Sequence, residues 1–132
     1  MFVDASAIVA ILAGEPEATE LMAKLDLAIL PLTSAVAVWE AVVGLTRKKQ
    51  GLHPQDARSE IQRLLDVAGV QMVTIGEAER DAALHAFDRF GKGRHPARLN
   101  MGDCFAYACA KTHGAPLLFK GDDFSKTDIA AA

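Results

Sequence analysis

The chain has 132 residues, of which 51% are hydrophobic and 23% are charged, a balance typical of one compact soluble domain with a buried core. Its net charge of -3 excludes a molecule that is basic overall, so binding of a polyanion requires a local basic surface. No apolar run reaches the roughly 20 residues of a membrane-spanning helix, and no basic segment precedes the first apolar residues. The two cysteines, Cys104 and Cys109, point about 140° apart on one predicted helix and are unsuited to a disulfide. We therefore expect a single domain over residues 1–132, in the reducing cytoplasm and without contact to a membrane.

Short apolar runs alternate along the chain with segments of helical periodicity. Strands are expected at 2–3, 28–33, 70–75 and 117–119. Helices are expected at 7–13, 17–27, 35–50, 54–68, 77–90 and 101–113. Because the strands alternate with helices and are apolar on both faces, the pattern predicts an α/β fold, a three-layer α/β/α sandwich around a parallel sheet.

Acidic residues follow the first and the last of the predicted strands. Asp4 comes directly after the strand at 2–3, and Asp122 and Asp123 follow the strand at 117–119. Ligand sites of parallel sheets lie beyond the carboxyl ends of the strands, so these three side chains are expected on one rim of the sheet.

Two further acids occupy distinctive positions on predicted helices. Asp103 lies in the first turn of the helix at 101–113, where free backbone N–H groups favour an ionised carboxylate. Glu40 interrupts the mostly apolar stripe of the helix at 35–50, and a carboxylate buried there requires a partner.

Each acid taken singly also has a purely structural explanation. Asp4 and Asp103 can cap helices, Glu40 can pair with Arg47, and the aspartates at 122–123 can form a solvated turn. Several carboxylates on one rim, however, repel and raise one another's pKa unless a cation neutralises them. Mg²⁺ and Mn²⁺ prefer carboxylate and water ligands and can bind a substrate phosphate at their open positions. Taken together, the acids predict a divalent-metal site.

Motifs of several other enzyme classes are absent from the chain. There is no H-E-x-x-H, C-x-x-C or G-x-S-x-G pattern and no glycine-rich phosphate loop. Zinc hydrolysis, serine acyl transfer and nucleotide binding by such loops therefore lose support.

A basic, glycine-containing stretch at 89–98 precedes Asp103. It carries four formal positive charges and no acid. Contacts from such side chains to phosphates position a polyanion without reading its bases. The alternative is an ordinary solvated loop, but its closeness to Asp103 favours binding of a polyanion by Lys92, Arg94, His95 and Arg98.

Four motifs follow one another along nearly the whole chain. They are Phe2-Val3-Asp4-Ala5-Ser6-Ala7, Glu40 in the third predicted helix, Leu99-Asn100-Met101-Gly102-Asp103-Cys104-Phe105-Ala106-Tyr107, and Leu117-Leu118-Phe119-Lys120-Gly121-Asp122-Asp123-Phe124 with Thr127-Asp128-Ile129 after it. In this order they resemble the PIN-domain ribonucleases and, within them, the VapC-type toxins of bacterial toxin–antitoxin pairs.

The resemblance implies a PIN-like domain whose acids bind Mg²⁺ or Mn²⁺ and hydrolyse RNA phosphodiester bonds to leave 5′-phosphate ends. The first three acids of the family correspond to Asp4, Glu40 and Asp103. For the fourth, Asp123 is the better match and Asp122 is the alternative or an outer residue of the site. Ser6 matches a hydroxyl near the metal in relatives. The family further implies a homodimer and a cognate VapB-like antitoxin that blocks the site.

Two other functions stay open as alternatives. A phosphotransfer or phosphatase-type protein would also hold Mg²⁺ with rim acids and take a phosphoryl group on Asp4. The pair of aspartates separated by one residue that is typical of many such phosphatases is absent, since Ala5-Ser6 follows Asp4. A catalytically silent module with the same fold would hold RNA or a protein, and metal-dependent cleavage distinguishes it from a nuclease.

Overall fold

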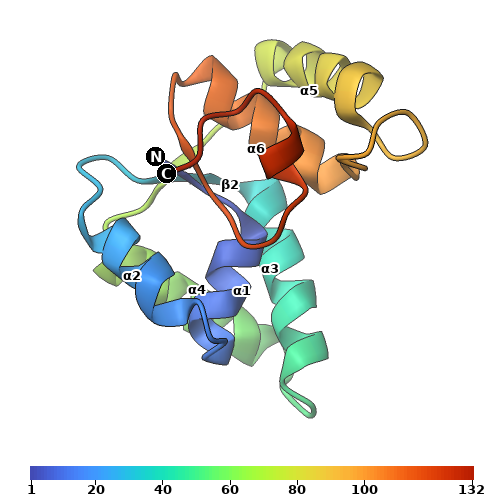
Figure 1. Ribbon diagram of the computed structural model, residues 1–132. Coiled ribbons are helices and arrows are strands. Elements are labelled where there is room, and N and C mark those ends of the chain that lie inside the picture. The colour runs from blue at the N-terminus through green and yellow to red at the C-terminus, as the bar shows by residue number, and fades with distance from the viewer.

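The computed structural model of the protein describes residues 1–132 and has a parallel four-stranded sheet at its centre (Figure 1). The strands are β1 (Phe2–Val3), β2 (Leu32–Ser34), β3 (Gln71–Val73) and β4 (Leu117–Leu118). Their order across the sheet is β3-β2-β1-β4, and Phe2 pairs with Leu32 on one side and Leu117 on the other. All pairs are parallel, so the four carboxyl ends lie at one edge of the sheet.

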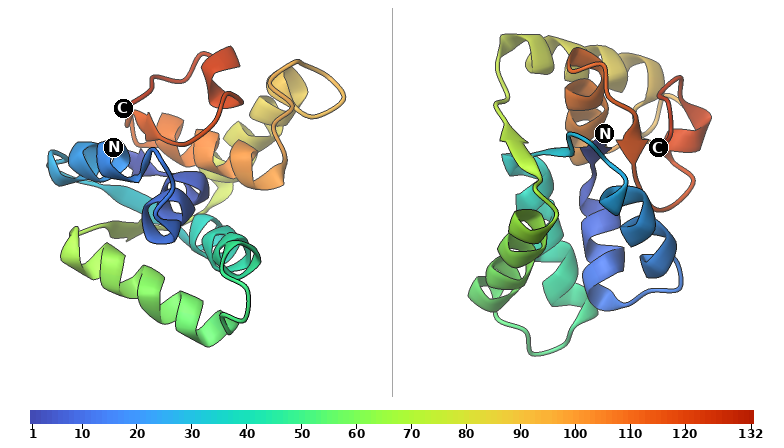
Figure 2. Two further views of the ribbon diagram at one scale, coloured as in Figure 1. Left: turned by 60° about the horizontal axis from the view of Figure 1, so that its bottom comes forward. Right: turned by 90° about the vertical axis from the view of Figure 1, so that its left-hand side faces the viewer.

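Helices cover both faces of this sheet, as Figures 1 and 2 show. They are α1 (Ala5–Ala13), α2 (Ala18–Asp26), α3 (Ala35–Lys48), α4 (Pro54–Val67), α5 (Glu77–Phe90) and α6 (Met101–Thr112), followed after β4 by the short 3₁₀ helix η1 (Phe124–Lys126). One apolar core lies among the four helices α1, α2, α3 and α4 and includes the fully buried Ile8, Leu45 and Ile61. A second core joins α5 and α6. The predicted α/β/α sandwich is therefore confirmed. None of the helices combines the length and the apolar character that a bilayer-spanning segment requires.

At two strand ends a side chain caps the next helix without an intervening turn. Asp4 follows β1 and accepts a hydrogen bond from the backbone N–H of Ser6, and α1 begins at the residue after Asp4. Ser34 ends β2 and accepts a hydrogen bond from the N–H of Ala37 at the start of α3. The helix expected at 7–13 therefore begins two residues earlier, at Ala5, because the cap satisfies the first free N–H groups of α1 at once.

The second and third strands are shorter than the sequence predicts. The strand expected at 28–33 begins only at Leu32, because Pro31 has no N–H to donate to a neighbouring strand, and the apolar Ile29 is fully exposed. The strand expected at 70–75 is reduced to β3 at the edge of the sheet, where only β2 pairs with it.

Packing of α4 against α1 and α3 is tested by truncating Ile61. This side chain has no exposed surface, so Ile61→Ala leaves a cavity, and we expect it to lower the free energy of unfolding by about 2–5 kcal/mol in urea denaturation. The control is Val67→Ala at the end of the same helix, where the side chain is 78% exposed. We expect this exposed substitution to change stability by no more than about 0.5 kcal/mol. Equal denaturation midpoints for the two variants would contradict the placement of α4.

Candidate active site

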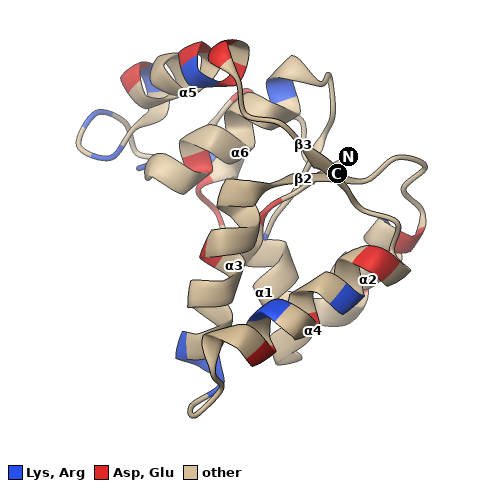
Figure 3. Ribbon diagram, turned by 180° about the vertical axis from the view of Figure 1, so that it is seen from behind, with Lys and Arg blue, Asp and Glu red and all other residues tan.

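Four acids from separate parts of the sequence approach one another at the carboxyl-end edge of the sheet. They are Asp4 after β1, Glu40 on α3, Asp103 in the first turn of α6 and Asp123 in the loop after β4. The charges of Asp4 and Asp103 act on Glu40, and those of Asp4 and Asp123 act on Asp103. Figure 3 shows acidic positions on and between α3 and α6. The structure thus brings together four of the predicted site residues.

Asp4 is the most deeply buried of the four acids, with 3% of its surface exposed. Its Oδ2 accepts hydrogen bonds from the backbone N–H of Ser6 at 2.9 Å and from the Ser6 hydroxyl at 2.5 Å. Burial raises the pKa of this carboxyl, and the hydrogen bonds from Ser6 oppose that rise. The Ser6 oxygen in turn accepts a hydrogen bond from the backbone N–H of Lys120 at 3.0 Å. Ser6 therefore links Asp4 to the loop that carries the aspartate pair.

Glu40 lies where α3 approaches the start of α6. Its carboxylate lies against the main chain of Gly102, and a Cβ atom at position 102 would overlap it. Burial raises the pKa of Glu40 to about 7, and the charges of Asp4 and Asp103 add to the rise. Glu40 forms no ion pair with Arg47, so the structural pairing considered for it is absent.

Gly102 is a site residue to which sequence reasoning assigned no role. A glycine in the first turn of a helix is a weak signal, since glycine disfavours helix interiors yet occurs there for many reasons. Its position directly before Asp103 is the feature that could have drawn attention to it. Its importance follows from the close approach of Glu40, which comes from another helix.

Asp103 both caps α6 and faces the other acids. Its Oδ2 accepts a hydrogen bond from the backbone N–H of Asn100 at 2.9 Å, and Asn100 Oδ1 accepts one from the N–H of Asp103 at 2.9 Å. Burial raises the pKa of Asp103 to about 6; the Asn100 hydrogen bond opposes the rise, whereas the charges of Asp4 and Asp123 add to it. The capping explanation is therefore correct, and it leaves Oδ1 of the same carboxylate available to the site.

The two adjacent aspartates differ in their relation to the site. Both are exposed, but only the charge of Asp123 acts on Asp103. Asp122 contributes its backbone carbonyl, which accepts a hydrogen bond from the Ser125 hydroxyl at 2.6 Å. The geometry therefore favours Asp123 over Asp122 as the fourth acid.

The donor set of this site suits a hard divalent cation. All four side chains are carboxylates, and none of them forms an ion pair with a lysine or arginine, although the chain has ten such pairs elsewhere. The carboxylates do not form a compact group of three at metal-ligand distance. Like charges in a partly buried site separate, and a cation removes that repulsion. The residues present therefore fit Mg²⁺ or Mn²⁺, which accept carboxylate and water oxygens.

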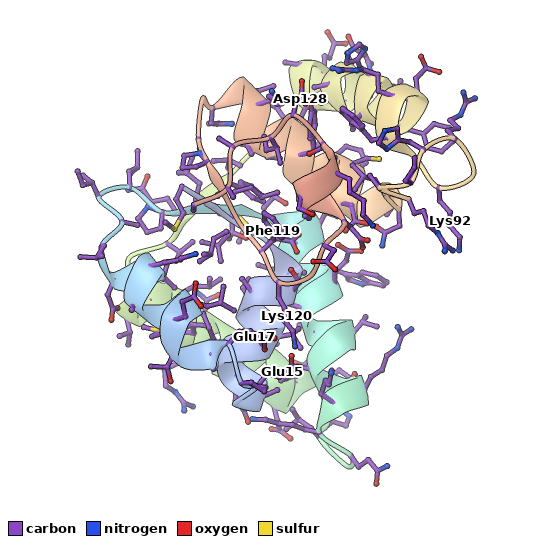
Figure 4. The ribbon with its side chains drawn as sticks, viewed as in Figure 1. Glu15, Glu17, Lys92, Phe119, Lys120 and Asp128 are labelled. Atoms are coloured by element: carbon purple, nitrogen blue, oxygen red, sulfur yellow. The ribbon has the colours of Figure 1, made fainter.

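The basic loop before α6 uses its charged side chains in two ways. Arg94 pairs with Asp88 at 3.1 Å and lies over the Phe87 ring. His95 packs edge-on against Phe90, and its Nδ1 accepts a hydrogen bond from the N–H of Ala97 at 3.1 Å, so this side chain shapes the loop. The other two members of the predicted set, Lys92 (labelled in Figure 4) and Arg98, are exposed and make no ion pair.

Comparison with known proteins agrees with this fold. The family model of the PIN domain matches residues 1–130. The chain is 39% identical over 130 residues to the VapC ribonuclease Mb0640 of Mycobacterium bovis, covering 98% of this chain and 96% of the relative. It is 42% identical over 132 residues to the ribonuclease VapC of Mycolicibacterium smegmatis, covering 99% and 98%. The crystal structure of VapC20 of Mycobacterium tuberculosis, described as a sarcin-ricin loop cleaving toxin, matches with a TM-score of 0.74 and 20% identity over 99% of this chain and 97% of that one.

The likeness to VapC20 supports the fold, and the family model and the curated relatives establish the family. The resemblance predicted from the four sequence motifs is thereby confirmed. With a match that spans residues 1–130 and relatives that align over almost their whole length, the chain belongs to the PIN-domain family and, within it, to the VapC ribonucleases.

Proposed function

We propose that Asp4, Glu40, Asp103 and Asp123 form a divalent-metal centre at which this chain, as the toxin of a VapBC-type module, hydrolyses RNA. The observation that carries the proposal is the mutual electrostatic effect of four carboxylates that come from four separate segments and lack any basic partner. Asp4, Asp103 and Asp123 would hold the ion, with Glu40 binding directly or through water. Mg²⁺ or Mn²⁺ bound there would supply an activated water and offset the charge that grows on the phosphoryl oxygens.

The chain's own side chains would divide the remaining work. Asp4 is fixed by Ser6 through one carboxylate oxygen, which leaves Oδ1 for other partners. Glu40 lies beside Asp4 and Asp103 and would accept a proton from the attacking water. No covalent nucleophile is needed, and departure of the ribose 3′-oxygen leaves a 5′-phosphate.

The exposed basic side chains would position the RNA backbone. Lys92 and Arg98 are available for phosphate contacts in their present positions. Arg94 would have to exchange Asp88 for a phosphate, and His95 would act by shaping the loop. Such contacts orient the strand without selecting its sequence.

A second copy of the chain and a VapB-like antitoxin are the partners that we propose. An apolar hollow of about 300 Å³ lies between α5 and the start of α6, lined by Leu84, Phe87 and Met101 among others. These three side chains are large and exposed. Exposed apolar surface of this kind is typical of an interface between proteins, which supports a homodimer or an antitoxin contact beside the site.

The first prediction concerns cleavage of RNA by aspartate variants. Asp4→Asn and Asp103→Asn keep a side-chain oxygen for capping but remove a ligand charge, so we expect cleavage to fall about 100-fold or more while the fold persists. Asp123→Asn should show the same loss, and Asp122→Asn serves as the matched control with activity close to wild type. The measurement is incubation with total RNA, with and without Mg²⁺, followed by mapping of the new ends.

Two outcomes would favour the alternatives. Absence of cleavage by the wild type at any Mg²⁺ or Mn²⁺ concentration, together with retained RNA binding, would indicate a silent binding module. Acid-labile phosphate on Asp4 after treatment with a small phosphodonor would indicate phosphotransfer. Normal cleavage by Asp4→Asn would reject the assignment of the site.

The second prediction concerns stability of the metal-free protein against pH. The carboxyl pKa values of Asp4, Glu40 and Asp103 are raised in the folded state, to about 7 for Glu40 and about 6 for Asp103. The folded state therefore binds more protons than the unfolded state between about pH 4 and pH 7, and the free energy of unfolding falls as pH rises through this window. Glu40→Gln should flatten this dependence and stabilise the metal-free protein near pH 8 by about 1 kcal/mol, since solvent screens a half-buried group.

Addition of Mg²⁺ to the wild type should reverse the fall in the free energy of unfolding that occurs as pH rises. At 100 times its dissociation constant the ion should add about 2.7 kcal/mol, provided that it binds only the folded state. Thermal denaturation between pH 5 and 8, with and without Mg²⁺, measures both effects. A stability that does not vary with pH and does not change with Mg²⁺ would argue against a metal centre.

The third prediction concerns the basic loop. Charge reversal of Lys92 and Arg98 should weaken RNA binding and reduce the salt dependence of the affinity by about one unit of slope for each phosphate contact removed, while metal binding stays unchanged. Lys24→Glu on α2, whose lysine pairs only with Glu20, is the control for a general change in net charge. An unaltered salt dependence of RNA affinity in the variant of Lys92 and Arg98 would identify an ordinary solvated loop.

A further inference from the structure

A cluster of two lysines and two glutamates lies outside the carboxylate site and belongs to none of the functions described above. Its centre is Glu15, in the turn after α1, whose side chain is only 12% exposed. Oε1 of Glu15 pairs with Nζ of Lys48 at 2.9 Å, and Oε2 accepts a hydrogen bond from Nζ of Lys120. Lys120 also pairs with Glu17 at 3.1 Å. Figure 4 shows Glu15, Glu17 and Lys120 side by side.

The cluster joins three of the four segments that carry the site acids. Glu15 follows α1, the helix capped by Asp4. Lys48 is the last residue of α3, the helix that carries Glu40. Lys120 lies in the loop after β4 and precedes the aspartate pair by two residues. A single carboxylate, that of Glu15, therefore fixes the relative positions of these three segments.

Lys120 is held at both ends. Its side chain reaches Glu15 and Glu17, while its backbone N–H donates to the Ser6 hydroxyl, which itself donates to Asp4. The next residue, Gly121, has a φ of 103°, a conformation that L side chains rarely adopt. A fixed Lys120 followed by this turn determines where the chain enters the aspartate pair.

The pairs around Glu15 differ from an ordinary surface ion pair, because one mostly buried carboxylate holds two lysines. Hydrogen bonds from Lys120 and then Lys48 lower the pKa of Glu15, so that it stays ionised at neutral pH. Exposed pairs such as Glu20–Lys24 contribute little, because solvent screens them and ordering two long side chains opposes them. A mostly buried carboxylate with two cations is screened less and constrains its neighbours more.

We propose that Glu15 and Lys120 are positioning residues of the carboxylate site, which hold the loop after β4 so that Asp123 faces Asp103. The inference rests on the proposed metal centre. In this proposal the ion-pair cluster holds the three segments in their relative positions before the cation binds. In this role the cluster would act through the loop and would not itself be a ligand of the ion.

The test compares Glu15→Gln and Lys120→Met with wild type in two measurements. In the metal-free protein, hydrogen exchange of the loop amides, that of Lys120 above all, should become about tenfold faster because the loop opens locally more often. Affinity for Mn²⁺, measured by titration calorimetry, should fall about tenfold, the lower end of what loss of supporting residues produces at metal sites. The double variant should lose less than the sum of the two single variants, since both remove the Glu15–Lys120 pair.

Matched variants separate positioning from general stability. Lys120→Arg restores the ion pairs and should bind Mn²⁺ like wild type, as should Glu20→Gln, which removes an exposed pair on α2. Should Glu15→Gln fail to fold, Lys48→Met removes one of its two cations and applies the same test in a milder form. Variants that melt at lower temperature but keep wild-type loop exchange and Mn²⁺ affinity would overturn the proposal.

Failure of the underlying function gives a different result. If Asp4→Asn binds Mn²⁺ as tightly as wild type, or if wild type binds none, the metal centre itself is wrong and the proposal falls with it. If Asp4→Asn loses Mn²⁺ while Glu15→Gln and Lys120→Met bind it normally, only the positioning role is refuted.

Discussion

The burial of the Asp4 carboxylate at the end of β1 is the constraint on which the remaining structure depends. A charge with 3% exposure is tolerated only if neighbouring groups compensate it. The free N–H groups of α1 and the hydroxyl of Ser6 do so in part, and this cap is also what starts the helix directly after the strand. The same burial leaves Asp4 close enough to raise the pKa of Glu40 and Asp103. Local helix formation and the electrostatics of the site therefore have one cause.

A structural role coincides with the proposed role in metal binding at these acids. Asp4 and Asp103 are both helix caps, and the caps give each carboxylate a defined orientation with one oxygen left free. A capping hydrogen bond stabilises the ionised form, whereas burial and the other acids destabilise it. The balance leaves the site without a positive charge to offset its carboxylates. A metal ion or a rearranged lysine would supply that charge. The proposed metal centre would thus lower the stability of the metal-free protein, as is common at functional sites.

Local sequence patterns predicted the order of the elements well, including a helix at 77–90 with the bounds of α5. Periodicity, caps and strand ends depend on residues that are close together in the sequence, so a single sequence is enough to predict them. The contact of Glu40 with Gly102 and the pairing of Lys120 with Glu15 depend on how separate segments meet in space. Arg94 was predicted to contact RNA, but in the structure it pairs with Asp88 across a turn. A count of charges in the sequence cannot show such a pair.

The two cysteines of α6 give the molecule an internal reporter. Both thiols are free and buried, and burial raises the pKa of each to about 11, with the charge of Asp103 adding to the rise at Cys104. A neutral, inaccessible thiol does not react with alkylating reagents. Labelling therefore requires this helix to separate from its neighbours, and its rate reports how often the segment that carries Asp103 opens in an otherwise intact protein.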